Sequence, residues 1–219
     1  MKDNILYEDK YLIALLKKPG ELSQSNSQED MLSALPFQGH IINRLDQPVG
    51  GIVLIAKDKA TAAEMTEQML EGSIAKSYLA VVRGKCRDRD SLTDYLMINR
   101  RLNLSKVVNK GMKDAKEAKL SYELIAYRDN LSLIRVELYT GRHHQIRVQL
   151  AHNNTPIWGD TKYNPEFKHK RGVLPALFAY RLNFTHPYTN KPIEIKVIPD
   201  YGKFSDFSEE INEIYNSNI

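Results

Sequence analysis

The sequence predicts an α+β fold with a mainly antiparallel, mixed sheet and flanking helices. Most strand-like segments follow one another through short turns, and a few amphipathic helical segments lie between them. A chain of 219 residues can bury a substantial core, and its 42% hydrophobic and 26% charged residues are ordinary for a folded domain. We therefore expect a single domain that spans residues 1–219.

Eight segments are expected to be strands, because they are apolar, β-branched or alternating and are bounded by turn residues. They are residues 5–7, 11–16, 50–56, 76–84, 119–127, 131–139, 176–184 and 193–198. The turns at 8–10, 129–130 and 187–192 join six of them into three antiparallel hairpins. The 50–56 segment is apolar on both faces, as expected of a covered strand.

Four segments are expected to be helices. They are residues 29–35, 59–71, 142–152 and 206–215. The 59–71 helix has the clearest limits, since Asp58 is a suitable N-cap and Gly72 a suitable C-terminal stop. Pro36 ends the first of the four helices, and the last has an apolar stripe at helical spacing.

The positive charge is concentrated in one part of the sequence. The formal net charge is +4, and the residues from Asp200 onward carry −4, so the first 199 residues carry +8. Seven bases lie between positions 100 and 119: Arg100, Arg101, Lys106, Lys110, Lys113, Lys116 and Lys119. Such a surface suits a polyanion, while a solvated charged face is the alternative interpretation.

The cysteine content and the hydropathy pattern exclude several classes of protein. Cys86 is the only cysteine, which excludes intramolecular disulfides and multi-cysteine zinc sites. The N-terminus has no signal-peptide pattern, and no apolar run approaches the roughly 20 residues that span a bilayer. We expect a cytoplasmic monomer with no membrane partner.

One segment carries a candidate catalytic carboxylate. Arg44 and Asp46 are two positions apart just before the apolar 50–56 strand, so both side chains project from one face if the segment is extended. Pro48 prevents simple pairing into that strand. A kinked entry with glycines is a suitable place to expose a reactive group, and we interpret Asp46 as catalytic.

A second segment has the residues of a phosphate-binding helix start. Gly141 lies at an expected junction of strand and helix, where backbone N–H groups are free, and Arg142, His144 and Gln145 supply further donors. The alternative is an exposed polar helix with a small apolar contact to the core.

Four motifs, in order, resemble the RluA-type pseudouridine synthases. The first motif is Arg44-Leu45-Asp46 with residues 51–57, and the second is the Lys-x-Tyr-x-Ala-x-Val-x-Gly pattern of residues 76–84. The third is the Thr-Gly-Arg-x-His-Gln-Ile-Arg pattern of residues 140–147, which continues through Pro156-Ile157-x-Gly159-Asp160 to Tyr163. The fourth is the segment of residues 177–187. The likeness runs from about residue 5 to residue 200. It implies the pseudouridine synthase catalytic fold.

The resemblance implies isomerisation of a uridine in ribosomal or transfer RNA. In that reaction the N1–C1′ bond is broken, the uracil turns, and C5 is joined to C1′, with no metal or cofactor. Asp46 matches the catalytic aspartate of the family. Attack on the ring, attack on the sugar and elimination to a glycal all stay open for it.

The resemblance also assigns two further catalytic residues. Arg147 matches the arginine that pairs with the catalytic carboxylate and holds it ionised. Tyr78 matches the tyrosine whose ring stacks on the target base, and its hydroxyl can also assist removal of the C5 proton.

Five residues are assigned to substrate binding. Arg44 and Arg142 are expected to contact the flipped nucleotide and its phosphates, and His144 and Gln145 to shape the site. Leu177 matches an apolar position beside the pocket, where it would exclude water.

The sequence departs from the family pattern at three places. Asn43 replaces a usual His, Phe178 replaces another, and residues 48–50 replace a Thr-Ser stretch. The chain also begins almost directly at the hairpin that opens the catalytic domain, so no separate N-terminal RNA-binding domain is expected. The basic 100–119 region is then the candidate for binding RNA.

Three other functions compete with this interpretation. A catalytically inactive RNA-binding module would have the same basic surface. A glycoside hydrolase could use Asp46 and Asp160 as its carboxylate pair. A metal hydrolase would need His143, His144 and His152, but the first two would point about 100° apart on a helix.

Overall fold

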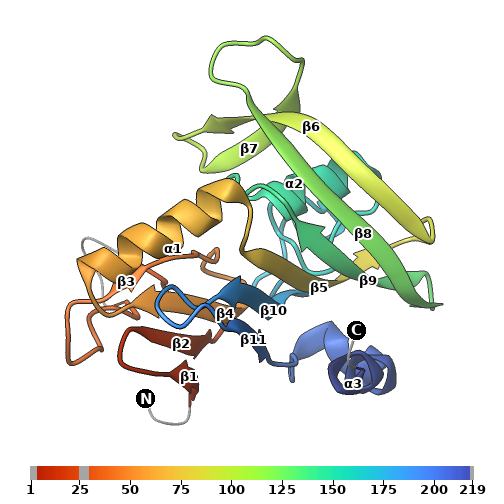
Figure 1. Cartoon of the computed structure of the whole chain (residues 1–219). Coiled ribbons are helices and arrows are strands. Elements are labelled where there is room, and N and C mark those ends of the chain that lie inside the picture. Colours follow the sequence, from red (N-terminus) through yellow and green to blue (C-terminus); the bar gives the residue numbers. More distant parts are fainter. Residues whose placement is uncertain (1–3, 25–29, 218–219) are drawn as a thin grey trace. The chain divides into compact units, whose positions relative to one another are not determined.

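The computed structural model describes residues 4–24 and 30–217, which fall into two compact units. Unit 1 comprises the chain up to Lys76 together with Phe178–Pro199, and unit 2 comprises Ser77–Leu177 and the chain from Asp200. Figure 1 shows the elements of both units along the chain. Antiparallel pairing dominates in each unit, which confirms the α+β prediction.

Unit 1 is a sheet covered on one face by a helix. Its elements are β1 (Ile5–Glu8), β2 (Leu12–Lys17), β3 (His40–Ile41), β4 (Gly50–Ala56), α1 (Lys59–Glu71), β10 (Leu177–Thr185) and β11 (Pro192–Lys196). The first residue of β10, Leu177, belongs to unit 2. β2 lies antiparallel between β1 and β4, and β11 lies antiparallel to β10. β4 and β10 run parallel through Gly50 and Gly51, which pair with Phe178 and Ala179.

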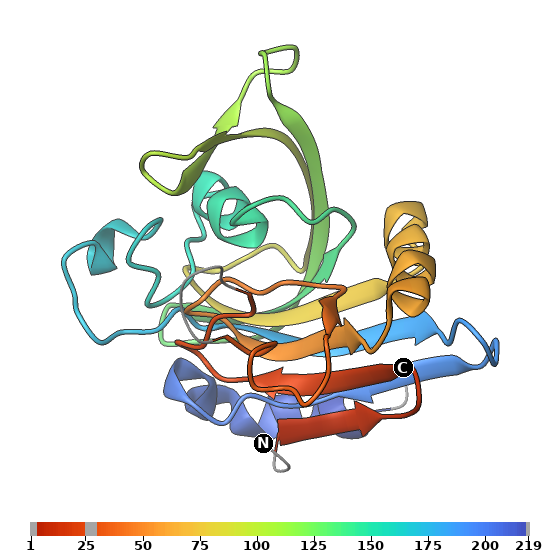
Figure 2. The same cartoon turned by 90° about the vertical axis from the view of Figure 1, so that its left-hand side faces the viewer.

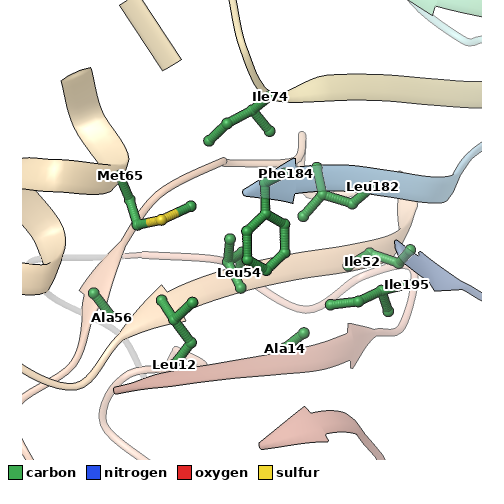
Figure 3. Packing of buried hydrophobic residues seen from close by; sticks show 10 residues of the cluster. All are labelled: Leu12, Ala14, Ile52, Leu54, Ala56, Met65, Ile74, Leu182, Phe184 and Ile195. Carbon is green, nitrogen blue, oxygen red and sulfur yellow. The ribbon is translucent and has the colours of Figure 1, made fainter. Parts of the chain in front are cut away.

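The core of unit 1 lies between α1 and the sheet (Figure 3). Alternate residues of each strand point to the same face, and those facing α1 are apolar. The buried cluster comprises Leu12, Ala14, Ile52, Leu54, Ala56, Met65, Ile74, Leu182, Phe184 and Ile195. Every residue of β4 is buried, as predicted for a covered strand.

Gly51 allows the close approach of β4 and β10. Its φ is +128°, and a Cβ at this position would lie 2.3 Å from the carbonyl oxygen of Ala179. Only glycine tolerates both this φ and this approach. The residue therefore fixes where the strand that follows Asp46 meets its parallel neighbour.

Helix α1 has the predicted limits. The Asp58 carboxylate accepts a hydrogen bond from the Thr61 N–H at 2.9 Å, and the Gly72 N–H is bonded to the carbonyls of Gln68 and Met69. Both signals are local in the sequence, so the prediction of 59–71 is confirmed.

Unit 2 is built on a five-stranded antiparallel sheet. Its strands are β5 (Ala75–Arg83), β6 (Arg89–Asn99), β7 (Leu104–Val108), β8 (Lys116–Arg128) and β9 (Leu131–Leu138), paired in the order β5-β9-β8-β6-β7. The first two residues of β5 belong to unit 1. Asp129 and Asn130, both with positive φ, form the tight turn of the predicted β8–β9 hairpin.

Helix α2 (Gln145–His152) packs against the curved β6–β8 part of this sheet (Figure 2). Its Val148 is buried against Leu96 of β6 and Ala118 of β8. The remaining helical elements are η2 (Pro165–Phe167), η3 (Gly202–Phe207) and α3 (Ser208–Asn216).

Several predicted elements need correction. The expected 142–152 helix starts only at Gln145, because His144 adopts a left-handed φ of 53°. The expected 29–35 helix is wrong where it is described, since residues 31–37 form turns and bends, while Glu29 lies outside the described residues. The first turn of the expected C-terminal helix belongs to η3, and α3 follows it.

Strands β6 and β7 were not predicted, although they form the edge of the unit 2 sheet. Most of their exposed residues are charged or polar, so the apolar signal of a strand is weak. No helix within residues 4–24 and 30–217 is long and apolar enough to cross a membrane.

Candidate active site

The Asp46 loop joins β3 to β4 in unit 1 and is anchored by the buried Asn43. The Asn43 side chain donates to the Ile52 carbonyl at 2.9 Å and accepts from the Leu54 N–H at 2.8 Å. It therefore pairs with β4 as a neighbouring strand would. This departure from the family pattern has a structural role in the chain.

Side chains alternate between buried and solvent-facing positions along this loop. Asn43 and Leu45 are buried, Arg44 is exposed and Asp46 is half-buried. The Ser23 hydroxyl bonds to both the N–H and the carbonyl of Leu45, each at 3.2 Å. The alternation fits the predicted shared face of Arg44 and Asp46.

Arg147 of α2 forms a buried ion pair with Asp160 in unit 2. The Nε–Oδ2 distance is 2.7 Å and the Nη2–Oδ1 distance is 2.8 Å, with side-chain exposures of 3% and 0%. Burial alone would raise the pKa of Asp160, but the hydrogen bonds and charge of Arg147, with the N–H groups of Lys162 and Tyr163, lower it. The carboxylate stays ionised and holds the guanidinium in a fixed plane.

The chain after α2 is shaped to deliver Asp160 to this pair. Ile157 forms a bridge with Val82 of β5, and the backbone then turns at Gly159. Gly159 has a φ of +78°, and a Cβ there would lie 2.2 Å from the Leu174 carbonyl oxygen. Sequence reasoning matched Asp160 to a motif but did not identify it as the partner of Arg147.

Tyr163 connects Arg147 to His144. Its hydroxyl lies 2.8 Å from His144 Nδ1 and accepts from the Ser105 N–H at 2.7 Å, while its ring lies 5.3 Å from the Arg147 guanidinium. These contacts hold the left-handed His144 just before α2. Tyr163 was matched to a family motif but was given no role from the sequence.

The geometry of the histidines corrects one premise of the metal-hydrolase alternative. His143 and His144 precede α2, and their rings stack with centroids 3.7 Å apart rather than pointing about 100° apart. His143 Nδ1 lies 2.9 Å from the Ser105 hydroxyl. In the described part of the chain, no three His, Cys, Asp or Glu side chains are grouped to hold a metal ion.

The side chains of Gln145 and Arg142 are fixed against β8 by hydrogen bonds to its backbone carbonyls. The Gln145 side chain accepts from the Thr140 hydroxyl at 2.8 Å and from the Arg142 N–H at 3.0 Å, and it donates to the Lys119 carbonyl. The exposed Arg142 donates from Nε to the Glu117 carbonyl at 2.9 Å. Since α2 starts at Gln145, the expectation that the helix starts at Arg142, directly after Gly141, is wrong.

Tyr78 and Leu177 are both buried in unit 2. Tyr78 is 7% exposed on β5, where it pairs with Val136 of β9. The Leu177 carbonyl accepts from the Tyr201 hydroxyl at 3.3 Å. Their expected contacts with the base and the pocket stay predictions.

The predicted site residues are divided between the two units. Arg44 and Asp46 lie in unit 1. Unit 2 contains the other six: Tyr78, Arg142, His144, Gln145, Arg147 and Leu177. Within unit 2 the structure brings His144 together with Arg147 through Tyr163, and Arg142 together with Gln145. The ion pair expected between Asp46 and Arg147 stays a prediction.

The comparisons agree on one family. A family model described as RNA pseudouridylate synthase matches residues 9–152. The tRNA pseudouridine synthase C of Haemophilus ducreyi is 31% identical and covers 91% of this chain and 92% of its own. The ribosomal large subunit pseudouridine synthase C of Buchnera aphidicola is 32% identical over 90% of this chain and 67% of its own.

A solved structure shows the same fold. It is that of human RNA Pseudouridylate Synthase Domain Containing 4, with a TM-score of 0.77 and 19% identity. It covers 98% of this chain, and the match spans 94% of the human chain.

Proposed function

This chain belongs to the RNA pseudouridylate synthase family, and from that premise we propose that it isomerises a uridine of ribosomal or transfer RNA with Asp46 as its catalytic carboxylate. Relatives named for transfer RNA and for the ribosomal large subunit both resemble it, so the proposal keeps both substrates. The observation that carries it is the half-buried Asp46, which lies on a loop that the buried side chains of Asn43 and Leu45 anchor just before it.

The reaction is balanced within one nucleotide. The N1–C1′ bond breaks, the uracil turns, a C5–C1′ bond forms, C5 loses its proton and N1 gains one. The target base must leave its stack to reach the protein. Asp46 then either bonds covalently to the nucleotide or withdraws a proton from the sugar on the route to a glycal.

Arg147 and Tyr78 are proposed as the other catalytic residues. Asp160 supports the role of Arg147, because two hydrogen bonds fix the guanidinium plane and leave it little freedom to rotate. The family role of Tyr78 is stacking on the base, and its buried place on β5, paired with β9, makes it a rigid platform.

RNA is proposed to bind the basic surface of unit 2. We define this surface as the seven exposed bases Arg100, Arg101, Lys106, Lys110, Lys113, Lys116 and Lys119. They lie on the β6–β8 extension and its two connecting loops (Figure 1). Lys119 is paired with Glu117 at 2.7 Å. Exposed lysines and arginines of this kind contact phosphates rather than nucleobases. The monomeric state and the cytoplasmic location stay predictions from the sequence.

The test is tritium release from RNA labelled at uridine C5. Wild-type protein should release tritium from a ribosomal or transfer RNA pool, and the Asp46→Asn variant should be slower by roughly 10³-fold or more. Asp88→Asn, which changes an exposed carboxylate, is the matched control and should keep full activity. Release that persists in Asp46→Asn would overturn the assignment, while binding of RNA without turnover by the wild type would favour the RNA-binding module.

A further inference from the structure

Lys17, the last residue of β2, has a fully buried ammonium group. Its side chain is 0% exposed, which is rare for a lysine unless every donor is satisfied. The Nζ donates to the carbonyl oxygens of Val49 at 2.8 Å, Gln47 at 2.9 Å and Lys18 at 3.2 Å. An ammonium has three N–H donors, so these bonds account for all of them.

Two of these acceptors belong to the turn that follows Asp46. The Val49 N–H closes that turn on the Asp46 carbonyl at 3.0 Å. The Gly20 N–H also donates to the Gln47 carbonyl, at 2.8 Å, and the Gln47 side chain donates back to Gly20. The Lys17 ammonium is therefore the buried centre of a set of bonds that tie the Asp46 turn to the end of β2.

The ammonium also acts on Asp46 through its charge. Burial lowers the pKa of Lys17 to about 8, and the negative charges of Glu21 and Asp46 oppose that shift. Below that pH the group is a cation, and its charge is attracted to the negative charges of Glu21 and Asp46.

We propose that Lys17 is a positioning residue for Asp46, which holds the turn after the carboxylate through the carbonyls of Gln47 and Val49. The inference rests on the proposed function, in which Asp46 is the catalytic carboxylate. Without the ammonium, two carbonyls of the turn lose a buried donor and the turn loosens. A displacement of about 1 Å at a reacting group can slow a reaction roughly 10²-fold.

The first test measures the turn itself and needs no RNA. In Lys17→Met, amide hydrogen exchange at Val49 should become at least roughly 10-fold faster, because the turn opens more readily. Lys18→Met is the matched control, since this neighbouring side chain is exposed and its carbonyl is retained. Unchanged protection of Val49 in Lys17→Met would overturn the proposal whether or not the protein has synthase activity.

The second test measures tritium release from uridine-labelled RNA. In Lys17→Met the kcat should fall roughly 10- to 100-fold, while the KM for RNA stays within about 3-fold because the basic surface is intact. An unchanged kcat would contradict the positioning role. A wild type with no release from any RNA, beside a loosened turn in Lys17→Met, would overturn the proposed function and not the role of Lys17 in the turn.

A third measurement uses wild-type protein alone and so does not depend on whether the variant folds. Above pH 8 the ammonium of Lys17 loses a proton and keeps at most two donors. Protection of the Val49 amide, corrected for intrinsic exchange, should fall as pH rises from 7 to 9.5. Protection that stays constant while the NMR shifts of the Lys17 side chain show loss of its proton would contradict the proposal.

Discussion

Arg147 and Asp160 form a deeply buried ion pair, with side-chain exposures of 3% and 0%. Their geometry shows how a single carboxylate, 13 residues further along the chain, fixes the orientation of a proposed catalytic group. Asn43 acts in a comparable way in unit 1, where its side-chain amide makes two hydrogen bonds with the β4 backbone that a neighbouring strand would otherwise make. At this scale the residue types could be predicted from motifs. The partners could not, because they depend on how distant segments meet.

The Asp160→Asn variant should be strongly destabilised. It leaves the buried Arg147 guanidinium opposite a neutral amide, and breaking one side of a buried pair typically costs about 3–5 kcal/mol. Chemical denaturation monitored by circular dichroism would measure the change. The exposed control Asp88→Asn should change the free energy of unfolding by less than about 0.5 kcal/mol, and an equally small change in Asp160→Asn would show that the pair contributes little.

The same pair predicts a dependence of stability on pH. The folded-state pKa of Asp160 is lowered, so its contribution is fully present above the unfolded-state pKa of about 4 and is lost as pH falls through the lower folded-state pKa. Below pH 4 the wild type should therefore lose stability more steeply than Asp160→Asn. Parallel curves for the two proteins in acid would rule out this contribution.

Asn43→Ala should loosen the entry to β4. It removes a donor and an acceptor from buried backbone groups of Ile52 and Leu54, and each unsatisfied group costs roughly 1–3 kcal/mol. We expect a loss of about 2–4 kcal/mol in the free energy of unfolding, measured with denaturant. Gln38→Ala, an exposed amide before β3, is the control and should have little effect.

Elements with local signals could be predicted, and elements that depend on distant contacts could not. Helix α1 has its cap and its stop within the segment itself, and its limits are correct. Helix α2 starts late because Tyr163 and Ser105, which are far away in the sequence, hold the histidines before it. Strands β6 and β7 were missed because their mixed polar and apolar residues give little strand signal. Pairing stabilises them, since β6 pairs with β8 and β7 pairs with β6.

At the scale of elements, Gly51→Ala should disrupt the parallel contact of β4 with β10. The added methyl would lie 2.3 Å from the Ala179 carbonyl, at a φ that alanine rarely adopts. The thermal midpoint should fall by at least 10 °C, which corresponds to roughly 3 kcal/mol or more for a chain of this size. Gly141→Ala is the matched control, because a Cβ there meets nothing within 4 Å. A similar midpoint for both variants would contradict the steric argument.

At the scale of the whole molecule, the proposed RNA-binding residues and the proposed catalytic carboxylate lie in different stretches of the chain. The basic surface lies on the β6–β8 extension of unit 2, whereas Asp46 lies on a loop of unit 1. The sequence located both, because a run of bases and a motif are each visible without knowledge of the fold. The single-domain organisation and the joint site of Asp46, Tyr78 and Arg147 stay predictions.

Charge reversal on the basic surface should weaken RNA binding in a salt-dependent way. Each phosphate contact releases counterions, so losing one reduces the slope of log K against log salt by about one. In the double variant Arg101→Glu with Lys113→Glu, the slope should fall by about two and the Kd should rise roughly 10- to 100-fold at low salt. Filter binding of labelled transfer and ribosomal RNA from 50 to 300 mM salt would measure both quantities.

The matched control changes net charge equally at another place on the chain. Lys59→Glu with Lys168→Glu replaces two exposed bases outside the basic surface and should retain the wild-type slope. If both double variants lost affinity equally, RNA would respond only to total charge, since long-range attraction depends on the whole field of the protein. A smaller slope confined to Arg101→Glu with Lys113→Glu, with kcat at saturating RNA unchanged, would assign phosphate contacts to the β6–β8 extension. It would also separate RNA binding there from the chemistry of Asp46.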